Sequence, residues 1–293
     1  MATRFSGRAR RNLARRHGGH GEGRARRGED EAPAEPNVFD GMTTCSRTRL
    51  HCPPGLDLPR YNRCMTIETP TVVLFDIDGT LINTGGAGRA ALEQALLNEF
   101  GIETPEQVPV MGRTDRGITG SLFEAHQIED SEENWIRFRD AYLAAVPHTL
   151  PTKQGLVLPH VPEVLDHLSQ QSNVELGLLT GNLDDGARIK LSYYGIYHHF
   201  EGGCGGYGDV STNRDDVARS ALDCVQQRFP SVEPEHIWVV GDTPLDIACS
   251  RAIGAKCVAL TTGTFSAEEL APHQPDLLLD SLGDEAFLQA ILS

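Results

Sequence analysis

The sequence has no apolar run long enough to cross a lipid bilayer and no pair of cysteines at C-x-x-C spacing. Because a transmembrane helix needs about 20 consecutive apolar residues, we expect no membrane association. The seven cysteines are scattered, so they predict neither a disulfide framework nor a zinc site, and the eleven histidines show no ligand spacing. This cysteine usage is typical of a reducing compartment, and we predict a cytoplasmic protein.

Residues 1–64 differ in composition from the rest of the chain. They contain 13 arginines, no lysine and 7 acidic residues, whereas residues 65–293 contain 13 basic and 34 acidic residues. The front segment is rich in Gly, Pro and Arg and lacks apolar periodicity, so we predict that it is disordered. Three interpretations stay open: a nucleic-acid contact, a transit peptide, or a translation start at Met65, which we favour. The acidic remainder argues against nucleic acid as a partner of the folded part.

The most informative segment is VVLFDIDGTLINT at residues 72–84. Its first four residues predict a strand buried on both faces, and ligands of open α/β sheets bind beyond the carboxyl ends of such strands. Asp76 and Asp78 follow directly. One carboxylate can attack phosphorus and form an aspartyl phosphate, while the other handles the proton of the leaving group. Taken alone, the pattern also fits a calcium loop or a plain turn.

Two later segments supply groups that can hold a phosphate. A second apolar strand, at residues 174–179, is followed by Thr180, Gly181 and Asn182. Their hydroxyl and backbone N–H groups can hold phosphoryl oxygens. A glycine-rich loop then leads to Arg214, whose guanidinium can bridge the nucleophile and a phosphoryl oxygen.

The last segment contains a third apolar strand followed by Asp242 and, four residues on, Asp246. Mg²⁺ prefers one or two carboxylates together with water and a substrate phosphate, so Asp242 with Asp76 suits this ion. Each later segment, considered singly, also fits a turn or a helix cap. Their order along the chain, each at the predicted carboxyl end of a strand, favours one catalytic site.

Together, these motifs resemble the haloacid dehalogenase superfamily, in particular its phosphatase branch with a helical cap inserted after the first motif. The resemblance covers about residues 70–293. It implies that Asp76 is the nucleophile and that Asp78 is the general acid and base, with the backbone carbonyl of Asp78 also binding Mg²⁺. Further residues that it implies are Thr180 for the phosphate, and Asp242 with Asp246 for the metal.

The third motif departs from the family pattern. The family normally carries a lysine there, whereas this chain has Arg214 in an Asn-Arg-Asp-Asp context. We interpret Arg214 as a variant of this motif, because the glycine-rich lead-in and the arginine resemble a phosphoglycolate-phosphatase-like subgroup. Lys190, on the preceding predicted helix, is the alternative residue for this position.

The alternation of strands and helices predicts an α/β fold, a doubly wound and mostly parallel Rossmann-like sheet with an inserted α-helical cap. Residues 65–84 and 153–293 form the expected core, and residues 85–152 the expected cap. Apolar stripes at helical spacing, such as Leu92 with Leu96, are expected to form the cap's own core.

We expect specificity to depend on the cap, because a cap that closes over the site can exclude water from the leaving-group side. Arg113, Thr114 and Asp115 in GRTD, and Arg89 near the first loop, are candidates to contact the leaving group. Thr114 or Asp115 equally fits a helix cap, and Arg89 a surface charge.

We predict a Mg²⁺-dependent hydrolase, monomeric or homodimeric, that acts on a small phosphorylated metabolite such as phosphoglycolate or a sugar phosphate. A phosphosugar mutase shares the motifs and is the alternative enzyme, and a non-catalytic phosphate-binding module is the alternative from another class. A dehalogenase would need neither Asp78 nor Asp242. A phosphonate-cleaving relative would need a cap lysine, which residues 81–152 lack.

The interpretation of residues 1–64 generates a direct test. A chain that starts at Met65 should keep full activity and melt at the same temperature as the full chain, because no motif lies before that residue. Phosphate release and a thermal melt of both chains measure this. A large drop in either quantity would show that the front segment contributes to the fold.

Overall fold

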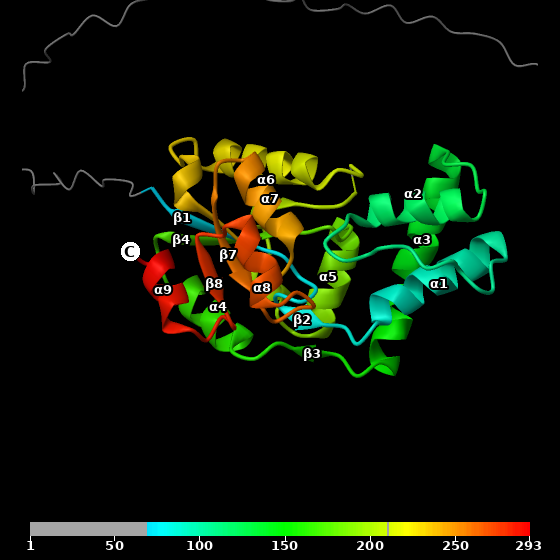
Figure 1. Ribbon diagram of the computed structural model, residues 1–293, viewed down its shortest axis with the longest axis horizontal. Helices are drawn as coiled ribbons and strands as arrows, with labels where there is room; N and C mark the ends of the chain where they lie inside the picture. Colours follow the sequence, from blue (N-terminus) through cyan, green and yellow to red (C-terminus); the bar gives the residue numbers. More distant parts are fainter. Residues whose placement is uncertain (1–68, 210) are drawn as a thin grey trace, which may run out of the picture. The chain divides into compact units, whose positions relative to one another are not determined.

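The computed structural model describes residues 69–209 and 211–293, so our expectations for residues 1–64 lie outside the described residues. Within the described residues, six strands form one parallel sheet in the order β5-β4-β1-β6-β7-β8 (Figure 1). These are β1 Thr71–Phe75, β4 Val174–Leu179, β5 Gly205–Gly206, β6 Ile237–Gly241, β7 Lys256–Leu260 and β8 Leu277–Leu279. No helix in the same residues has the length and apolar character of a membrane span.

Helices cover both faces of the sheet. They are α4 Val161–Ser169, α5 Asp184–Tyr193, α6 Arg214–Arg228, α7 Pro244–Ala252, α8 Ala267–Leu270 and α9 Glu285–Ile291. Successive side chains of a strand point to opposite faces, so a strand covered on both sides is apolar throughout. In β1, Val73 and Phe75 belong to one core cluster with α4 and α9, while Val72 and Leu74 belong to another with α6. The predicted α/β fold with a parallel sheet is confirmed.

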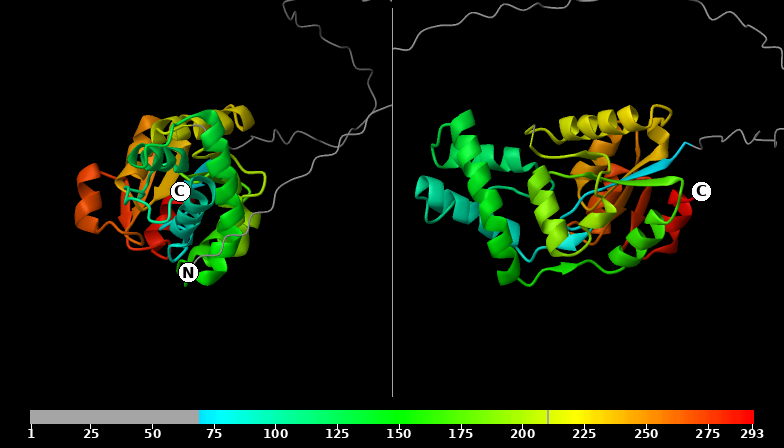
Figure 2. Two further views of the ribbon diagram at one scale, coloured as in Figure 1. Left: turned by 90° about the vertical axis from the view of Figure 1, so that its right-hand side faces the viewer. Right: turned by 180° about the vertical axis from the view of Figure 1, so that it is seen from behind.

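The segment between β2 (Ile82–Asn83) and β3 (Leu156–Val157) forms helices α1 Ala87–Phe100, α2 Asp115–Ala125 and α3 Glu132–Thr149, here called the helical group. This group has an apolar core of its own, in which Phe123 packs edge-on against Phe100 and Phe138 at centroid distances of 5.3 and 5.7 Å. Figures 1 and 2 show the group beside α5, beyond one end of the parallel strands. Its position leaves the carboxyl ends of the central strands facing it.

Two chain segments connect the helical group to the sheet, and they lie side by side. β2 and β3 pair as antiparallel strands, with Asn83 opposite Leu156. Gly85 and Gly86 follow β2 with φ angles of 61° and 89°. A Cβ atom at Gly85 would lie 2.9 Å from the backbone carbonyl carbon of Gln154, so the left-handed turn and the close approach of the two segments both require glycine there.

Candidate active site

The candidate site lies at the carboxyl ends of three neighbouring strands. Asp76, Thr180 and Asp242 directly follow β1, β4 and β6, and all three side chains are buried. Parallel strands end at the same edge of the sheet, so residues far apart in sequence meet there. Gly79, with a φ of 94°, turns the chain after Asp78, and a Cβ atom on it would collide with the Asp242 carboxylate.

Arg214 connects two of the buried carboxylates. It is the first residue of α6, where Asn213 caps the helix by accepting a hydrogen bond from Asp215 N. Its Nη2 donates to Asp76 Oδ1 at 3.0 Å and also to Asp246 Oδ1. Burial opposes the charge of Arg214, but Asp246 and Asp76 outweigh this effect and raise the pKa of the guanidinium. Arg214 therefore stays a cation next to Asp76.

The carboxylate of Asp246 is fully engaged within the protein. Oδ1 accepts from Arg214, and Oδ2 accepts from Thr243 N at 3.0 Å and from Thr243 Oγ1 at 2.7 Å. The Thr243 contacts form a capping box at the start of α7, in which Pro244 occupies the first turn. Asp246 thus fixes both the helix start and the guanidinium of Arg214.

The acidic residues fit a divalent cation. One carboxylate oxygen from each of Asp76, Asp242 and Asp246 lies within 4.8 Å of the other two. Oδ2 of Asp242 is buried and has no hydrogen-bond partner among the described residues. Burial, together with Asp246 and Asp76, raises the pKa of Asp242 to about 8, and burial above all raises that of Asp76 to about 6. A hard cation with oxygen ligands would supply the missing partner and offset the charge.

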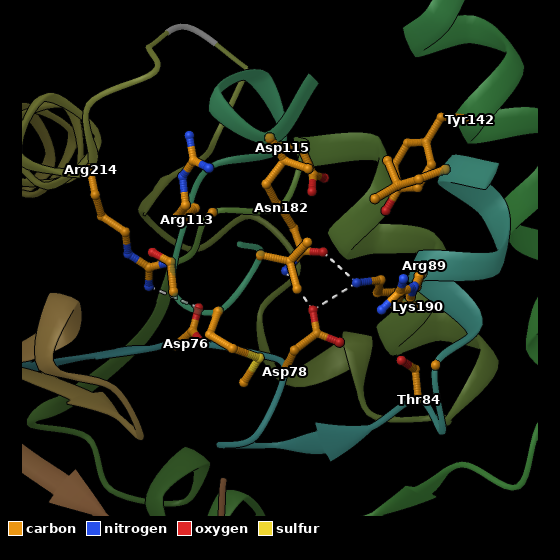
Figure 3. A pocket seen from close by; sticks show the side chains of 18 residues that line it. Asp76, Asp78, Thr84, Arg89, Arg113, Asp115, Tyr142, Asn182, Lys190 and Arg214 are labelled. Carbon is orange, nitrogen blue, oxygen red and sulfur yellow. Dashed lines mark hydrogen bonds and ion pairs between the residues drawn. The ribbon is translucent and has the colours of Figure 1, made fainter. Parts of the chain in front are cut away.

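The loop after β4 contacts the second aspartate. Oγ1 of the buried Thr180 accepts from Nδ2 of Asn182 at 2.9 Å, and the same Nδ2 donates to Asp78 Oδ2 at 2.9 Å. Lys190, from α5, donates to Asp78 Oδ2 at 2.7 Å and to Asn182 Oδ1 at 2.6 Å (Figure 3). Lys190 and Arg214 were alternatives for the third motif. The structure pairs Arg214 with Asp76 and pairs Lys190 with Asp78 instead.

A cavity of about 240 Å³ opens from the aspartates toward the helical group. Figure 3 shows Asp76, Asp78, Lys190 and Tyr142 around it. Gly181 and Asn182 also line it. The helical group contributes an apolar part of the wall, formed by Leu92, Val110, Met111 and Ile118. The end of the cavity near the aspartates is therefore strongly charged, and the end near the helical group is lined by both polar and apolar side chains.

The predicted leaving-group residues occupy different positions. Thr114 does not line the cavity, because its buried hydroxyl caps α2 by accepting from Gly117 N at 3.0 Å. The structure thus shows the helix-cap role that was the alternative interpretation, while contact of Thr114 with substrate stays a prediction. Arg113 lines the cavity, yet its guanidinium donates to the carbonyl oxygens of Pro109 and Gly117.

Asp115 and Arg89 both line the cavity, with different surroundings. Oδ2 of Asp115 accepts from Leu183 N at 3.0 Å, and burial raises the pKa of this carboxyl to about 6 despite the nearby Lys190. Arg89 forms an ion pair with Glu93 at 3.0 Å, and both side chains are about half exposed. Asp115 is thus the buried polar group that the helical group brings to the site.

Sequence reasoning missed the contacts of two residues. Tyr142 belongs to the kind of helical apolar stripe that we expected to form only the core of the cap, but this buried residue also lines the cavity. Its hydroxyl, within an otherwise apolar helical stripe, was the feature of the sequence that could have indicated a position at the cavity. Lys190 lies three and four residues after Ala187 and Gly186, which are buried on one face of α5. A lysine on a buried face indicates a specific partner.

The family model and two of the most similar relatives agree on one family of hydrolases. The model of the haloacid dehalogenase-like hydrolase family matches residues 73–260. A phosphoglycolate phosphatase of Pseudomonas fluorescens is 30% identical over 224 residues, which are 73% of this chain and 77% of that protein. A validoxylamine A 7'-phosphate phosphatase of Streptomyces hygroscopicus is 30% identical, with 72% of this chain and 93% of that protein covered.

A solved structure shares the fold. It is described as a predicted phosphoglycolate phosphatase from Haemophilus somnus, with a TM-score of 0.57 and 20% sequence identity. The match covers 75% of this chain and 98% of that one.

The raised pKa of Asp242 predicts how pH and Mg²⁺ affect stability. A carboxyl with a pKa of about 8 when folded and an ordinary low pKa when unfolded stabilises the metal-free protein at low pH. That contribution is lost as pH rises through about 8. Between pH 6 and 9 we expect the metal-free protein to lose about 2 kcal/mol from this group, or several degrees in melting temperature. Added Mg²⁺ should reduce the loss if these residues hold the ion, because a divalent cation would stabilise the ionised carboxylates.

Thermal melts at both pH values, with and without Mg²⁺, measure this effect. Asp242→Asn is the control, since it removes the titrating group and should show a smaller fall with pH and a smaller response to Mg²⁺. Equal falls in the original protein and in this variant would contradict the assignment to Asp242.

Proposed function

Because the chain belongs to the haloacid dehalogenase-like hydrolase family, we propose that it is a Mg²⁺-dependent phosphatase that hydrolyses a small phosphomonoester through a phospho-aspartate intermediate. The observation that carries this proposal is the buried contact of Arg214 with Asp76, beside Oδ2 of Asp242, which has no hydrogen-bond partner among the described residues. A cation next to a nucleophilic carboxylate attracts an anionic phosphate, and a second cation is needed to balance the remaining charge.

Asp76 is the proposed nucleophile. Arg214 holds its Oδ1, which leaves Oδ2 to attack phosphorus. Burial raises the pKa of Asp76 to about 6, whereas Arg214 and a hydrogen bond with the Thr180 side chain oppose this rise and favour the ionised, nucleophilic form. We propose that Arg214, Thr180 and the loop of Gly181 and Asn182 hold the phosphoryl oxygens for in-line displacement.

Asp76, Asp242 and the backbone carbonyl of Asp78 are the proposed protein ligands of Mg²⁺. The ion would neutralise charge on the phosphoryl group and fix its orientation. Both oxygens of Asp246 already accept hydrogen bonds, so we propose that Asp246 orients Arg214 and would support the ion through its charge. In the proposed mechanism Asp78 gives a proton to the departing alkoxide and then takes one from the water that hydrolyses the phospho-aspartate.

The cavity indicates a small substrate. The cavity lies between the aspartates and the helical group. We propose that this group, residues 85–152, acts as a cap. The part of the cavity farther from the aspartates is lined by Asp115, Tyr142 and apolar side chains. The names of the relatives give phosphoglycolate and validoxylamine A 7'-phosphate as their substrates, and for this chain we propose a small phosphomonoester such as phosphoglycolate or a sugar phosphate. A cytoplasmic location and a monomeric or homodimeric state stay predictions from the sequence.

Asp76→Asn should abolish Mg²⁺-dependent release of inorganic phosphate from a panel of small phosphomonoesters. Removing the nucleophile costs several orders of magnitude in kcat while the fold, followed by its melting temperature, is kept. The panel is measured with and without Mg²⁺. Isomerised product without free phosphate would indicate a mutase, and binding without turnover would indicate a phosphate-binding module.

Arg214→Ala should lower kcat/KM by about 10² to 10³, since the site loses a buried charged hydrogen bond. Arg214→Lys should recover only part of this, because an ammonium lacks the bidentate fork. The matched control is Arg219→Ala on the same helix, whose partner Asp216 lies at the surface. If both Arg214 variants worked normally while Lys190→Ala was crippled, the third motif would belong to Lys190.

A further inference from the structure

A second buried cation lies on the leaving-group side of the site. Lys190 is one of only three lysines in the chain, and its side chain is 5% exposed. It extends from α5 between the sheet and the helical group, where Gly88 and Tyr142 lie close to it. Its Nζ donates to Asp78 Oδ2 and to Asn182 Oδ1.

Packing alone does not explain an ammonium at this position. Taking a charged amine out of water costs several kcal/mol, and an apolar side chain of similar length often replaces a buried ion pair without loss of stability. The partner does not require the lysine for its own solvation, because the Asp78 side chain is 40% exposed. The orientation of Asp78 is what the buried lysine fixes.

The contacts distinguish the two oxygens of Asp78. Oδ2 accepts from both Lys190 and Asn182, and Asn182 is itself held by Lys190. Oδ1 accepts no hydrogen bond from the residues that the structure describes, although Asp78 lines the cavity. The carboxyl group is therefore anchored through one oxygen and free to exchange a proton through the other.

We propose that Lys190 is a positioning residue for leaving-group protonation, which it controls by holding Oδ2 of Asp78 so that Oδ1 faces the scissile oxygen. This rests on the proposed phosphatase function. As the bond from Asp76 to phosphorus forms and the bond from phosphorus to the leaving oxygen breaks, the proton on Oδ1 passes to that oxygen. Oδ1 later accepts a proton from the attacking water, and Lys190 stays protonated throughout.

Substrates that differ in their leaving group can test this role of Lys190. An alkoxide is a poor leaving group and needs the proton as the bond breaks, whereas a nitrophenolate departs as a stable anion. Loss of correct positioning should therefore affect alkyl phosphates much more than 4-nitrophenyl phosphate. The quantity to compare is kcat/KM, because it reports steps up to the departure of the leaving group and excludes hydrolysis of the phospho-aspartate.

The experiment measures kcat/KM of Lys190→Met and Lys190→Gln in the full chain with Mg²⁺. The substrates are 4-nitrophenyl phosphate and the alkyl phosphate that the original protein hydrolyses fastest. We expect Lys190→Met to lower the value for the alkyl ester about 10²-fold and that for the aryl ester less than about 10-fold. Lys190→Gln, which keeps a donor without the charge, should fall between Lys190→Met and the original protein.

Three variants serve as comparisons. Arg188→Met changes a cation on the same helix whose partner, Asp185, is at the surface, so both substrates should be unaffected. Asp78→Asn should show the same preference for the aryl ester as Lys190→Met. Arg214→Ala should reduce both substrates equally, because Arg214 contacts Asp76.

Equal loss on both substrates in the Lys190 variants would overturn the proposal, with or without a lower melting temperature. A change confined to KM, and seen only for substrates whose leaving group carries a carboxylate, would also overturn it, since Lys190 would then bind the leaving group itself. Failure of the proposed function looks different, because the original protein would then release no phosphate from either ester.

Discussion

Three buried carboxylates share one end of the sheet, and the surrounding structure is arranged around their repulsion. Asp76, Asp242 and Asp246 lie within reach of one ion, but Arg214 is their only buried cationic partner among the described residues. One guanidinium balances one charge. Burial, together with the negative charge that Arg214 does not balance, raises the pKa values of Asp76 and Asp242. One buried oxygen, Oδ2 of Asp242, also has no hydrogen-bond partner among the described residues. A divalent cation held here would resolve both, and this charge balance is the physical reason for the Mg²⁺ in the proposed function.

The sheet and the place of the site could be predicted because their signals are local. Each central strand is a short apolar run with few alternatives, and the residue after it is polar. Once the strands are parallel and adjacent, the ends of β1, β4 and β6 must meet, so Asp76, Thr180 and Asp242 are brought together by topology alone. The helices of the helical group could also be predicted from the sequence, because apolar residues recur there at helical spacing.

The contact of Arg214 with Asp76 was predicted, whereas the contact of Lys190 with Asp78 was not, because it depends on how α5 packs. Arg214 is the first residue of α6 and Lys190 lies well inside α5, and the two were alternatives for the third motif. Their separation follows from the direction of each helix face: α6 presents Arg214 to Asp76, and α5 presents Lys190 to Asp78. Thr114 shows the same limit. A hydroxyl beside a charged pair in GRTD fits either a ligand contact or a cap, and the cap role became visible only through the hydrogen bond that Gly117 N donates to it.

The contacts between the helical group and the catalytic loops are of a different kind from those inside the site. Gly112 O accepts from Arg214 Nη1, Asp115 N donates to Gly181 O, and Leu183 N donates to Asp115 Oδ2. Each involves a backbone group, and a typical hydrogen bond contributes about 0.5 to 1.5 kcal/mol net, or about 1.5 to 3 kcal/mol when one group is charged, as in Arg214. Buried apolar contacts add to these, because Leu183 packs within the core of the helical group. The ion pairs of Arg214 with Asp76 and Asp246 involve no residue of the helical group, so the pairing of Asp76 with its cation does not depend on that group's position.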